Sequence, residues 1–173
     1  MYYLKIIVKT FALLLFFCYE ANSQTDIAVK AIKHICYLEI AGIGGYGSLN
    51  YENVQYQKNN FMLSIRSGIS TYHLTDFMNK FNPDIIIPLA VNALYGKNHL
   101  VEFGLGQTIT NIVYSDPINF MQNRSTKLSS NLTLGYRYQK KQGGIVFRAG
   151  YMPIIENNKY FRHWAGISFG YTF

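Results

Sequence analysis

Apolar residues alternate with small or polar residues along most of this 173-residue chain. In the run at 128–138, for example, Leu132, Leu134 and Tyr136 are separated by threonine and glycine. A period of two sends successive side chains to opposite faces of a β-strand, whereas a helix would repeat its apolar residues every three or four positions. The chain is therefore predicted to be all-β, with eight strands at about 35–43, 46–55, 61–70, 84–95, 101–110, 128–138, 145–152 and 165–173.

The composition excludes two broad classes of protein. Hydrophobic residues make up 49% of the chain and charged residues only 14%, whereas disorder requires low hydrophobicity and high charge. A polytopic helical membrane protein would need several apolar runs of about 20 residues, which the chain lacks. The 15 Tyr and 12 Phe fit the pleated surface of a sheet, so their abundance agrees with the strand pattern.

The first 23 residues have the pattern of a secretory signal peptide. Lys5 and Lys9 accompany an apolar run at 11–18, and small or polar residues follow at 21–23. The apolar run is too short for a bilayer span of about 20 residues, which argues against a membrane-anchoring helix. We expect cleavage near residue 23, which leaves a barrel domain at 24–173 with one cysteine and no disulfide.

The chain is basic, with 16 Lys and Arg against 9 Asp and Glu. These basic residues are spread over turns and strand ends rather than clustered in one stripe, and an exported protein rarely meets nucleic acid. Nucleic acid is therefore not an expected partner.

The connections between the predicted strands alternate in length. Short ones at 57–60, 96–98 and 140–143 contrast with long ones at 72–83 and 115–126, as in bacterial outer-membrane barrels. The second face of the strands is rich in Gly, Ser, Thr and Asn, which suits a packed interior better than a soluble exterior. We expect a single closed up-and-down transmembrane barrel with both termini in the periplasm. A soluble lipocalin-like barrel is the alternative.

Six charged residues are predicted to share the barrel interior. Three are acidic and three are basic, and burying them is costly unless they pair. Eight strands leave room for little more than the barrel's own side chains. We therefore expect a salt-bridged plug without general porin activity; an ion or proton path is the alternative. The six residues are Glu39, Glu52, Arg66, Glu102, Arg137 and Arg148.

The chain ends on alternating aromatic residues, Phe169, Tyr171 and Phe173. This ending resembles the signal by which outer-membrane barrels are recognised for assembly. The chain as a whole resembles the small outer-membrane β-barrel proteins common in Bacteroidota. The resemblance implies a barrel among the lipids of the outer membrane, assembled by the barrel-assembly machinery, with no catalytic residues to carry over. Further stretches that carry the resemblance are 37–39, 47–52, 135–139, 143–144 and 147–150.

Two motifs are typical of binding sites but are better explained by structure. The glycine-rich stretch at 42–47 has the letters of a dinucleotide fingerprint, yet it runs into a predicted strand instead of opening a helix. We interpret it as a tight turn and expect no cofactor. The histidines lack metal-ligand spacing and are expected to be interfacial side chains rather than ligands. They are His34, His73, His99 and His163.

An enzyme is the alternative function, because some small outer-membrane barrels acylate or deacylate lipid A with a serine, a histidine and a carboxylate. The candidates here are Ser70, Tyr72 and His73 near the end of one strand, with His163 entering the last. Nucleophilic catalysis needs a base within hydrogen-bond reach of the nucleophile, and the sequence places no acid clearly beside these residues. A non-enzymatic structural or interaction protein is therefore the expected function.

The long loops at 72–83 and 115–126 contain several large apolar residues. Exposed apolar side chains of this kind indicate a surface for a protein partner. The alternative is that these loops fold over the barrel and cap its mouth. The residues are Phe77, Met78, Phe81, Ile118, Phe120 and Met121.

Overall fold

The computed structural model describes residues 34–115, 121–156 and 160–173, and these contain ten β-strands. No helix in these segments is long and apolar enough to cross a membrane. The strands are β1 (His34–Ala41), β2 (Gly47–Lys58), β3 (Phe61–Ser70), β4 (Ile85–Gly96), β5 (His99–Ser115), β6 (Gln122–Gln139), β7 (Gly144–Tyr151), β8 (Ile154–Glu156), β9 (Tyr160–Arg162) and β10 (Ala165–Thr172). The predicted signal peptide at 1–23 lies outside the described residues.

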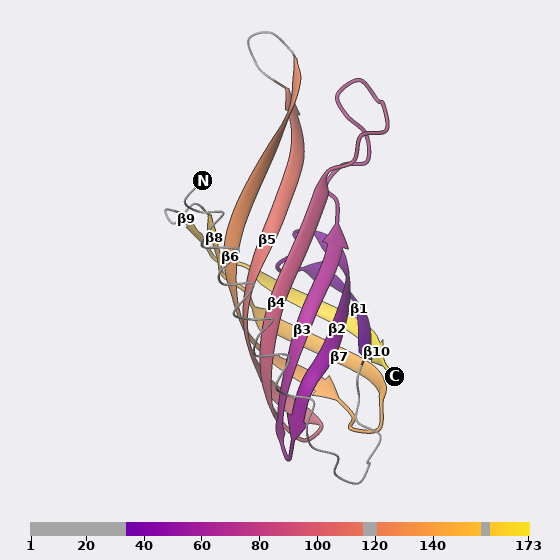
Figure 1. Cartoon of the computed structure of the whole chain (residues 1–173), viewed down its shortest axis with the longest axis vertical. Coiled ribbons are helices and arrows are strands. Elements are labelled where there is room, and N and C mark those ends of the chain that lie inside the picture. The colour runs from indigo at the N-terminus through magenta and orange to yellow at the C-terminus, as the bar shows by residue number, and fades with distance from the viewer. Residues whose placement is uncertain (1–33, 116–120, 157–159) are drawn as a thin grey trace. The chain divides into compact units, whose positions relative to one another are not determined.

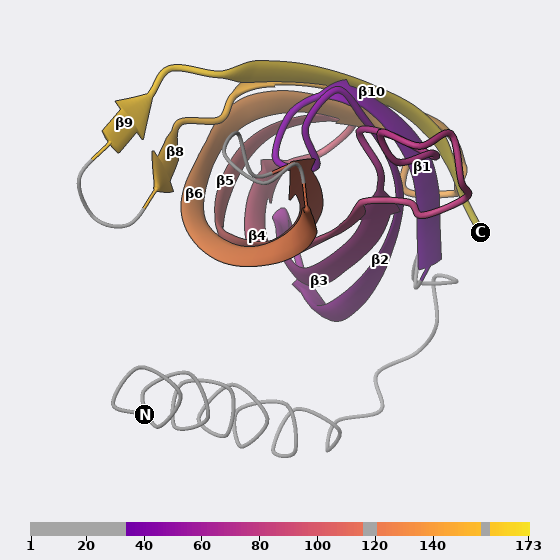
Figure 2. The same ribbon diagram turned by 90° about the horizontal axis from the view of Figure 1, so that it is seen from above.

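The strands close into one barrel, which Figure 2 shows from above. Neighbouring strands pair antiparallel, and β1 pairs with β10 to complete the ring. The short strand β8 follows β7 and pairs with β6 in the same register as β7 does. Strand β9 precedes β10, and the β8–β9 pairing has the same register as the β7–β10 pairing. The ten segments therefore make eight barrel strands, which confirms the predicted closed antiparallel all-β barrel.

The two ends of the barrel differ in the length of their connections. Three short turns, at 59–60, 97–98 and 140–143, lie at the same end as the start of β1 and the end of β10. Here the His34 amide donates to the Phe173 carbonyl at 3.3 Å. We call this the turn end and the opposite one the loop end. Connections 42–46 and 71–84 lie at the loop end, as do the end of β5 and the start of β6 (Figure 1).

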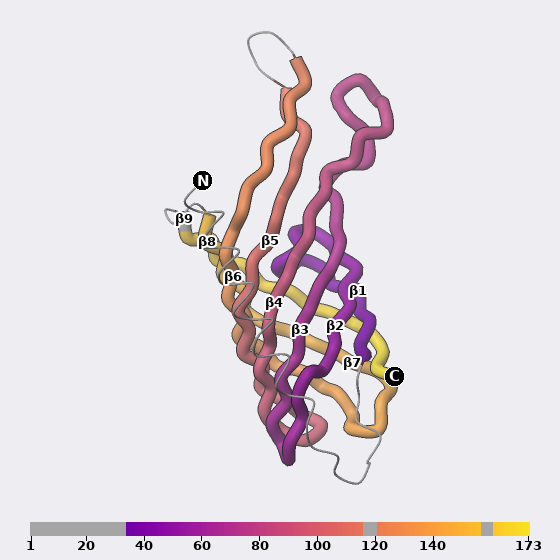
Figure 3. The backbone as a smooth tube through the Cα atoms, in the orientation of Figure 1, coloured from indigo at the N-terminus to yellow at the C-terminus, as the bar shows by residue number. Residues whose placement is uncertain are grey.

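The β5–β6 hairpin is longer than predicted and rises past the neighbouring strands at the loop end (Figure 3). The expectation of a loop at 115–126 is therefore wrong in extent, because Ser115 and residues 122–126 belong to strands; Ile118 and Phe120 lie outside the described residues. Apolar residues alternate with polar ones only where one face of a strand contacts lipid and the other packs inside the barrel. The parts of β5 and β6 beyond that region lack the pattern from which strands were predicted. Farther out, backbone pairing and polar contacts hold the hairpin, including a 2.8 Å hydrogen bond from Asn111 Nδ2 to Thr126 Oγ1.

Pro88 lies in the middle of β4, although proline cannot donate to a β-ladder. It pairs in register with Thr108 of β5 on one side. On the other side the β3–β4 pairing is interrupted between Ser67–Leu89 and Ser70–Ile86. The barrel accommodates the missing donor at this interruption, so the strand predicted at 84–95 forms despite its proline.

The barrel is apolar outside and polar inside. Its outward side chains are largely aliphatic or aromatic, such as Leu38 and Val101, which are 63% and 62% exposed. The inward positions of the same strands are buried and largely polar. A soluble barrel needs the reverse distribution, so the lipocalin-like alternative is wrong, and the apolar outer face is the surface that a lipid bilayer covers.

Candidate functional site

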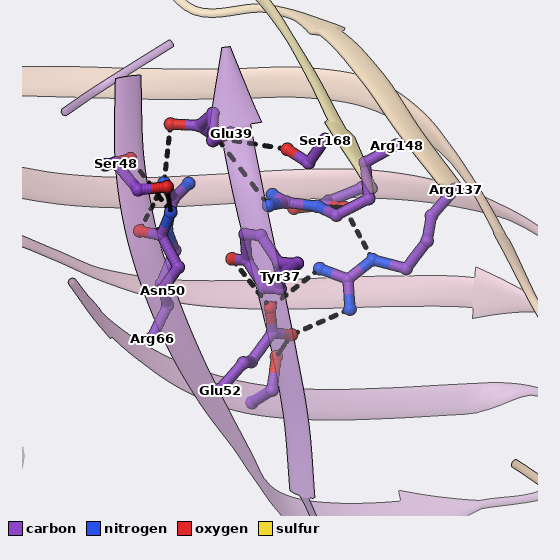
Figure 4. A network of polar contacts seen from close by, with 11 residues as sticks. Tyr37, Glu39, Ser48, Asn50, Glu52, Arg66, Arg137, Arg148 and Ser168 are labelled. Carbon is purple, nitrogen blue, oxygen red and sulfur yellow. Dashed lines mark hydrogen bonds and ion pairs between the residues drawn. The ribbon is translucent and has the colours of Figure 1, made fainter. Parts of the chain in front are cut away.

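The most distinctive feature of the interior is a chain of six alternating charges. Each comes from a different strand, and all six side chains are buried. The order of contacts is Arg66, Glu39, Arg148, Glu102, Arg137 and Glu52. These are the six residues that the sequence placed in the lumen, and Figure 4 shows most of them converging from the barrel wall.

Arg137 joins the two acidic residues at one end of the chain. Its Nη1 and Nη2 donate to Glu52 Oε1 and Oε2 at 2.8 and 2.9 Å, and its Nε donates to Glu102 Oε2 at 2.8 Å. The two parallel bonds match the planar guanidinium to the carboxylate, which makes this a strong and directional pair. Ser64 Oγ adds a 2.5 Å hydrogen bond to Glu52 Oε1.

Arg148 links both halves of the chain. Its Nε donates to Glu102 Oε2 at 3.0 Å, its Nη2 pairs with Glu102 Oε1, and its Nη1 lies 3.7 Å from Glu39 Oε2. Glu39 Oε1 in turn accepts from Arg66 Nη2 at 2.6 Å. Asn50 holds the same guanidinium through its Oδ1, which accepts from Nε and Nη2 of Arg66 at 3.1 and 2.8 Å.

Tyr37 fills the centre of this network (Figure 4). Its ring lies under two guanidinium groups, with the Cζ atoms of Arg148 and Arg66 at 4.6 and 5.4 Å from the ring centroid. Both distances suit cation–π attraction. The Tyr37 hydroxyl donates to Glu52 Oε2 at 3.1 Å, so one aromatic residue connects both ends of the charge chain.

The arrangement balances charge inside a space with little room for water. Three carboxylates face three guanidinium groups, so the network has no net charge. Removing one member of such a buried set leaves an uncompensated charge, which costs about 3–5 kcal/mol. The network thus ties strands β1, β2, β3, β5, β6 and β7 together across the barrel rather than along its hydrogen-bonded wall.

A plug at the loop end was not anticipated from the sequence. The turn at 42–46 folds into the barrel mouth and buries Ile43 against Ala90 and Met152. Thr108 Oγ1 donates to the Ile43 carbonyl at 2.9 Å and accepts from Asn131 Nδ2 at 3.2 Å. The turn that joins β1 to β2, and not loop 71–84, therefore covers this part of the lumen.

Glycine is needed for this inward turn. Gly42 and Gly45 have φ angles of 84° and 89°, a region that other residues rarely adopt. A Cβ atom at Gly45 would also stand 2.5 Å from the Tyr72 ring. The letters of the dinucleotide fingerprint are therefore explained by a turn that joins two antiparallel strands.

Apolar side chains pack together in the barrel interior at the turn end. Met62, Leu94 and Leu100 form one buried cluster there, while Ile35 and Val146 pack with Tyr37 in another. A hollow of about 10 Å³ lies beside the first cluster, which is about the space of one water molecule.

The residues considered for catalysis are engaged in separate contacts. Ser70 Oγ donates to the Gly47 carbonyl at 2.5 Å, and His163 Nδ1 bonds the Tyr151 hydroxyl at 2.6 Å. His73 does have an acidic neighbour, because its Nδ1 lies 3.0 Å from Asp84 Oδ2. This acid could not be assigned from the sequence, because only the folded loop brings the two residues together across eleven positions. Tyr72 packs edge-on against Tyr46, and burial of its ring raises the pKa of the Tyr72 hydroxyl.

Three of the four histidines form the same kind of pair on the outer surface. His34, His99 and His163 each bond a tyrosine hydroxyl through Nδ1, at 2.5, 2.6 and 2.6 Å. In each pair the tyrosine lies on the neighbouring strand, two residues from the position directly opposite the histidine. Amphipathic rings of this type are typical of the aromatic girdles of membrane barrels. No group of three His, Cys, Asp or Glu that could hold a metal occurs in the described parts of the chain.

The last strand presents its aromatic residues outward. Phe169, Tyr171 and Phe173 are each more than half exposed on β10 or just after it, and Phe169 packs against Phe147 of β7 at 5.0 Å between ring centroids. This geometry fits a lipid-facing strand. Recognition of these residues by the assembly machinery stays a prediction.

Loop 71–84 is an ordered hairpin that carries exposed apolar side chains. Asp76 Oδ1 accepts from the amides of Met78 and Lys80 at 2.9 and 3.0 Å, and these bonds hold the pKa of Asp76 below its usual value, the Lys80 bond most strongly. Met78, Phe77 and Phe81 are 65–79% exposed. The loop thus holds apolar groups in water instead of folding them over the mouth.

The barrel is similar to solved outer-membrane proteins. It matches the N-terminal β-barrel domain of OprF from Pseudomonas aeruginosa with a TM-score of 0.56 and 14% identity, over 83% of this chain and 97% of that one. It also matches Ail, the attachment invasion locus protein of Yersinia pestis, solved with the heparin analogue sucrose octasulfate, with a TM-score of 0.51 and 13% identity over 83% and 97% of the two chains.

These similarities show that the chain has the fold of outer-membrane β-barrel proteins. No family model matches the sequence. A search of curated proteins finds no match either.

Proposed function

We propose that this chain is a non-enzymatic outer-membrane barrel with a closed lumen, which anchors the exposed loop 71–84 at the cell surface for contact with a protein partner. In this proposal the signal peptide is removed and both termini face the periplasm. A Bacteroidota origin agrees with the sequence resemblance. The observation that carries the proposal is the filled interior, where a neutral charge network and the Ile43 turn occupy the space that a channel would need.

The absence of a pore is tested by conductance. The full chain is reconstituted into planar bilayers, and insertion is verified in the same lipid by the heat-dependent shift of its gel band. We expect no porin-like conductance steps above those of the bare bilayer. Steady conductance in the range of a general porin would show that the lumen opens and would overturn the proposal.

The partner surface is tested by substituting Phe77, Met78 and Phe81 with serine together. These side chains contribute little to the barrel because they are exposed, so the variant should retain its heat-dependent band shift. We expect a protein that co-purifies with the wild type in mild detergent to be lost. Tyr114→Ser on the other hairpin is the matched control and should retain it. Equal recovery with all three proteins would contradict the role of this loop.

One observation favours a second candidate, a lipid-modifying enzyme: the His73–Asp84 pair resembles the base and its orienting acid in a nucleophilic site. Against it, the Ser70 hydroxyl is directed to the Gly47 carbonyl. We expect the acylation pattern of lipid A to be the same in cells with the wild type, Ser70→Ala or His73→Ala. A changed pattern in either variant would support the enzyme instead.

A further inference from the structure

The charges outside the lumen are distributed unevenly between the two ends of the barrel. Among the described residues, the loop end mixes both signs, with Asp76, Asp84 and Glu156 near basic residues such as Arg162, which pairs with Glu156 at 3.3 Å. The turn end has no acidic side chain outside the lumen in the described part of the chain. The charged side chains described at this end are all lysines: Lys58, Lys97, Lys140 and Lys141.

These four lysines, which we call the lysine turn cluster, lie on or directly beside three separate turns that meet at one end. Lys141 Nζ donates to the Asn59 carbonyl at 3.2 Å and so joins the first turn to the third. The Gln139 amide donates to the Asn98 carbonyl at 2.9 Å, which joins the second turn to the third. An open hollow of about 280 Å³ lies between them, lined by Lys97, Asn98, Lys140, Lys141 and Gln142.

Aromatic side chains place this cluster at a definite depth in the membrane. Phe61 and Tyr95 face outward three residues from Lys58 and two residues from Lys97, and Tyr138 lies two residues before Lys140. Aromatic girdles of membrane barrels lie at the boundary between acyl chains and headgroups. The lysines just beyond the girdle therefore reach the layer of lipid phosphates.

We propose that the lysine turn cluster binds the phosphate groups of anionic phospholipids in the leaflet at the turn end. Ammonium groups act as point charges with three donors each, which suits phosphate oxygens. Asn98 and Gln142 add amide donors on the same hollow for a glycerol or phosphate oxygen. Basic residues close to an anionic membrane surface attract such lipids additively, and salt screens the attraction. The proposal rests on the barrel spanning a bilayer but on neither the partner nor the closed lumen.

The test compares lipid selectivity at the barrel surface. The full chain is reconstituted in phosphatidylcholine vesicles, and the association of spin-labelled phosphatidylglycerol is measured by electron paramagnetic resonance against spin-labelled phosphatidylcholine. We expect the wild type to prefer phosphatidylglycerol several-fold at low salt, with the preference falling at 0.5 M NaCl, a concentration at which the screening length drops to about 4 Å.

Variants identify the site. The triple variant Lys97→Gln, Lys140→Gln and Lys141→Gln should lower the preference to about one. The charge-matched control at the loop end, Lys80→Gln, Lys127→Gln and Arg162→Gln, should keep most of it. Replacing the three turn lysines with arginine should also preserve it. If the triple glutamine variant lacks the heat-dependent band shift of a folded barrel, Lys97→Gln alone is used, with a partial loss expected.

Three results would overturn the proposal. One is the absence of any phosphatidylglycerol preference in the wild type. Another is an equal loss of preference in the turn-end and loop-end variants. The third is binding of inorganic phosphate to the wild type in pure phosphatidylcholine vesicles without a phosphatidylglycerol preference, which would identify a free anion as the ligand.

Discussion

The lumen buries charged side chains, whereas loop 71–84 exposes apolar ones. In the lumen, Arg137 and Glu52 are fully buried and paired, whereas in the loop the apolar Phe81 is 79% exposed and Asp76 stands in water. Each arrangement would be unfavourable in the other place. Buried charges need partners, and exposed apolar groups on a rigid loop contribute little to folding. The difference assigns stability to the lumen and leaves the loop side chains available for the partner contact proposed above.

The largest effect should come from breaking the charge balance of the lumen. Glu52→Leu leaves Arg137 with Glu102 alone, which Arg148 already shares. We expect a loss of about 3–5 kcal/mol in the free energy of unfolding. It is measured from the urea midpoint in phospholipid vesicles, read from the intensity of the fast-migrating gel band of the folded barrel in unheated samples.

A double variant tests whether pairing is the cause. Glu52→Leu combined with Arg137→Met restores neutrality, because two acids and two bases remain. Replacing a buried pair by apolar residues is often neutral or stabilising, so we expect the double variant to be more stable than Glu52→Leu. A double variant that is no more stable would contradict the pairing argument.

Ile43 and Ile40 allow the inner and outer surfaces to be compared with one residue type. Ile43 is buried in the plug, and Ile40 faces outward on β1 with 59% exposure. Ile43→Ala leaves a cavity in the mouth and should cost about 2 kcal/mol or more, while Ile40→Ala leaves none. The urea midpoints of the two variants measure this. Equal losses would show that the turn at 42–46 does not pack as a plug.

The sequence predicts the barrel interior well because the interior follows a simple parity rule. Each charged residue of the network occupies an inward position of an alternating strand, so Glu39 and Arg148 could be assigned to the lumen without knowing any contact. The plug could not be predicted, since the alternation ends at Gly42 and a glycine-rich turn does not show which of its two large side chains, Ile43 or Tyr46, points inward. The His73–Asp84 pair and the extended β5–β6 hairpin were missed for a related reason. Both lie outside the lipid-facing region, where no alternation is required.

A smaller effect should come from the tyrosine–histidine pairs of the outer surface. Tyr136→Phe removes the 2.6 Å hydrogen bond to His99 Nδ1 but keeps the ring. We expect a loss of about 0.5–1.5 kcal/mol by the same urea assay. Tyr95→Phe, which removes a hydroxyl from a 65% exposed side chain, serves as the comparison. An unchanged midpoint for Tyr136→Phe would mean that the pair only positions the rings.

The smallest effect on stability should come from loop 71–84, where a substitution changes only the local order of the loop. Asp76→Ala removes the acceptor of the Met78 and Lys80 amides. We expect faster hydrogen exchange at these two amides and an unchanged urea midpoint. Because the pKa of Asp76 is lowered, its carboxylate still accepts both bonds at the usual Asp pKa of about 3.9, and the bonds weaken only as the pH falls further, through the lowered pKa. Loss of protection between pH 8 and 5 would contradict this assignment.

The central claim is that the barrel has its apolar face outside and its polar face inside. The most direct test is the gel mobility of the protein from the outer-membrane fraction, in detergent with and without boiling. A closed barrel with a paired polar interior resists the detergent until it is heated. We expect a compact, fast-migrating band in the unheated sample and a slower band near the 19.9 kDa of the full chain, less any cleaved signal peptide, after boiling. A single band in both samples, with the protein in the soluble periplasmic fraction, would contradict the assignment of the apolar face to lipid.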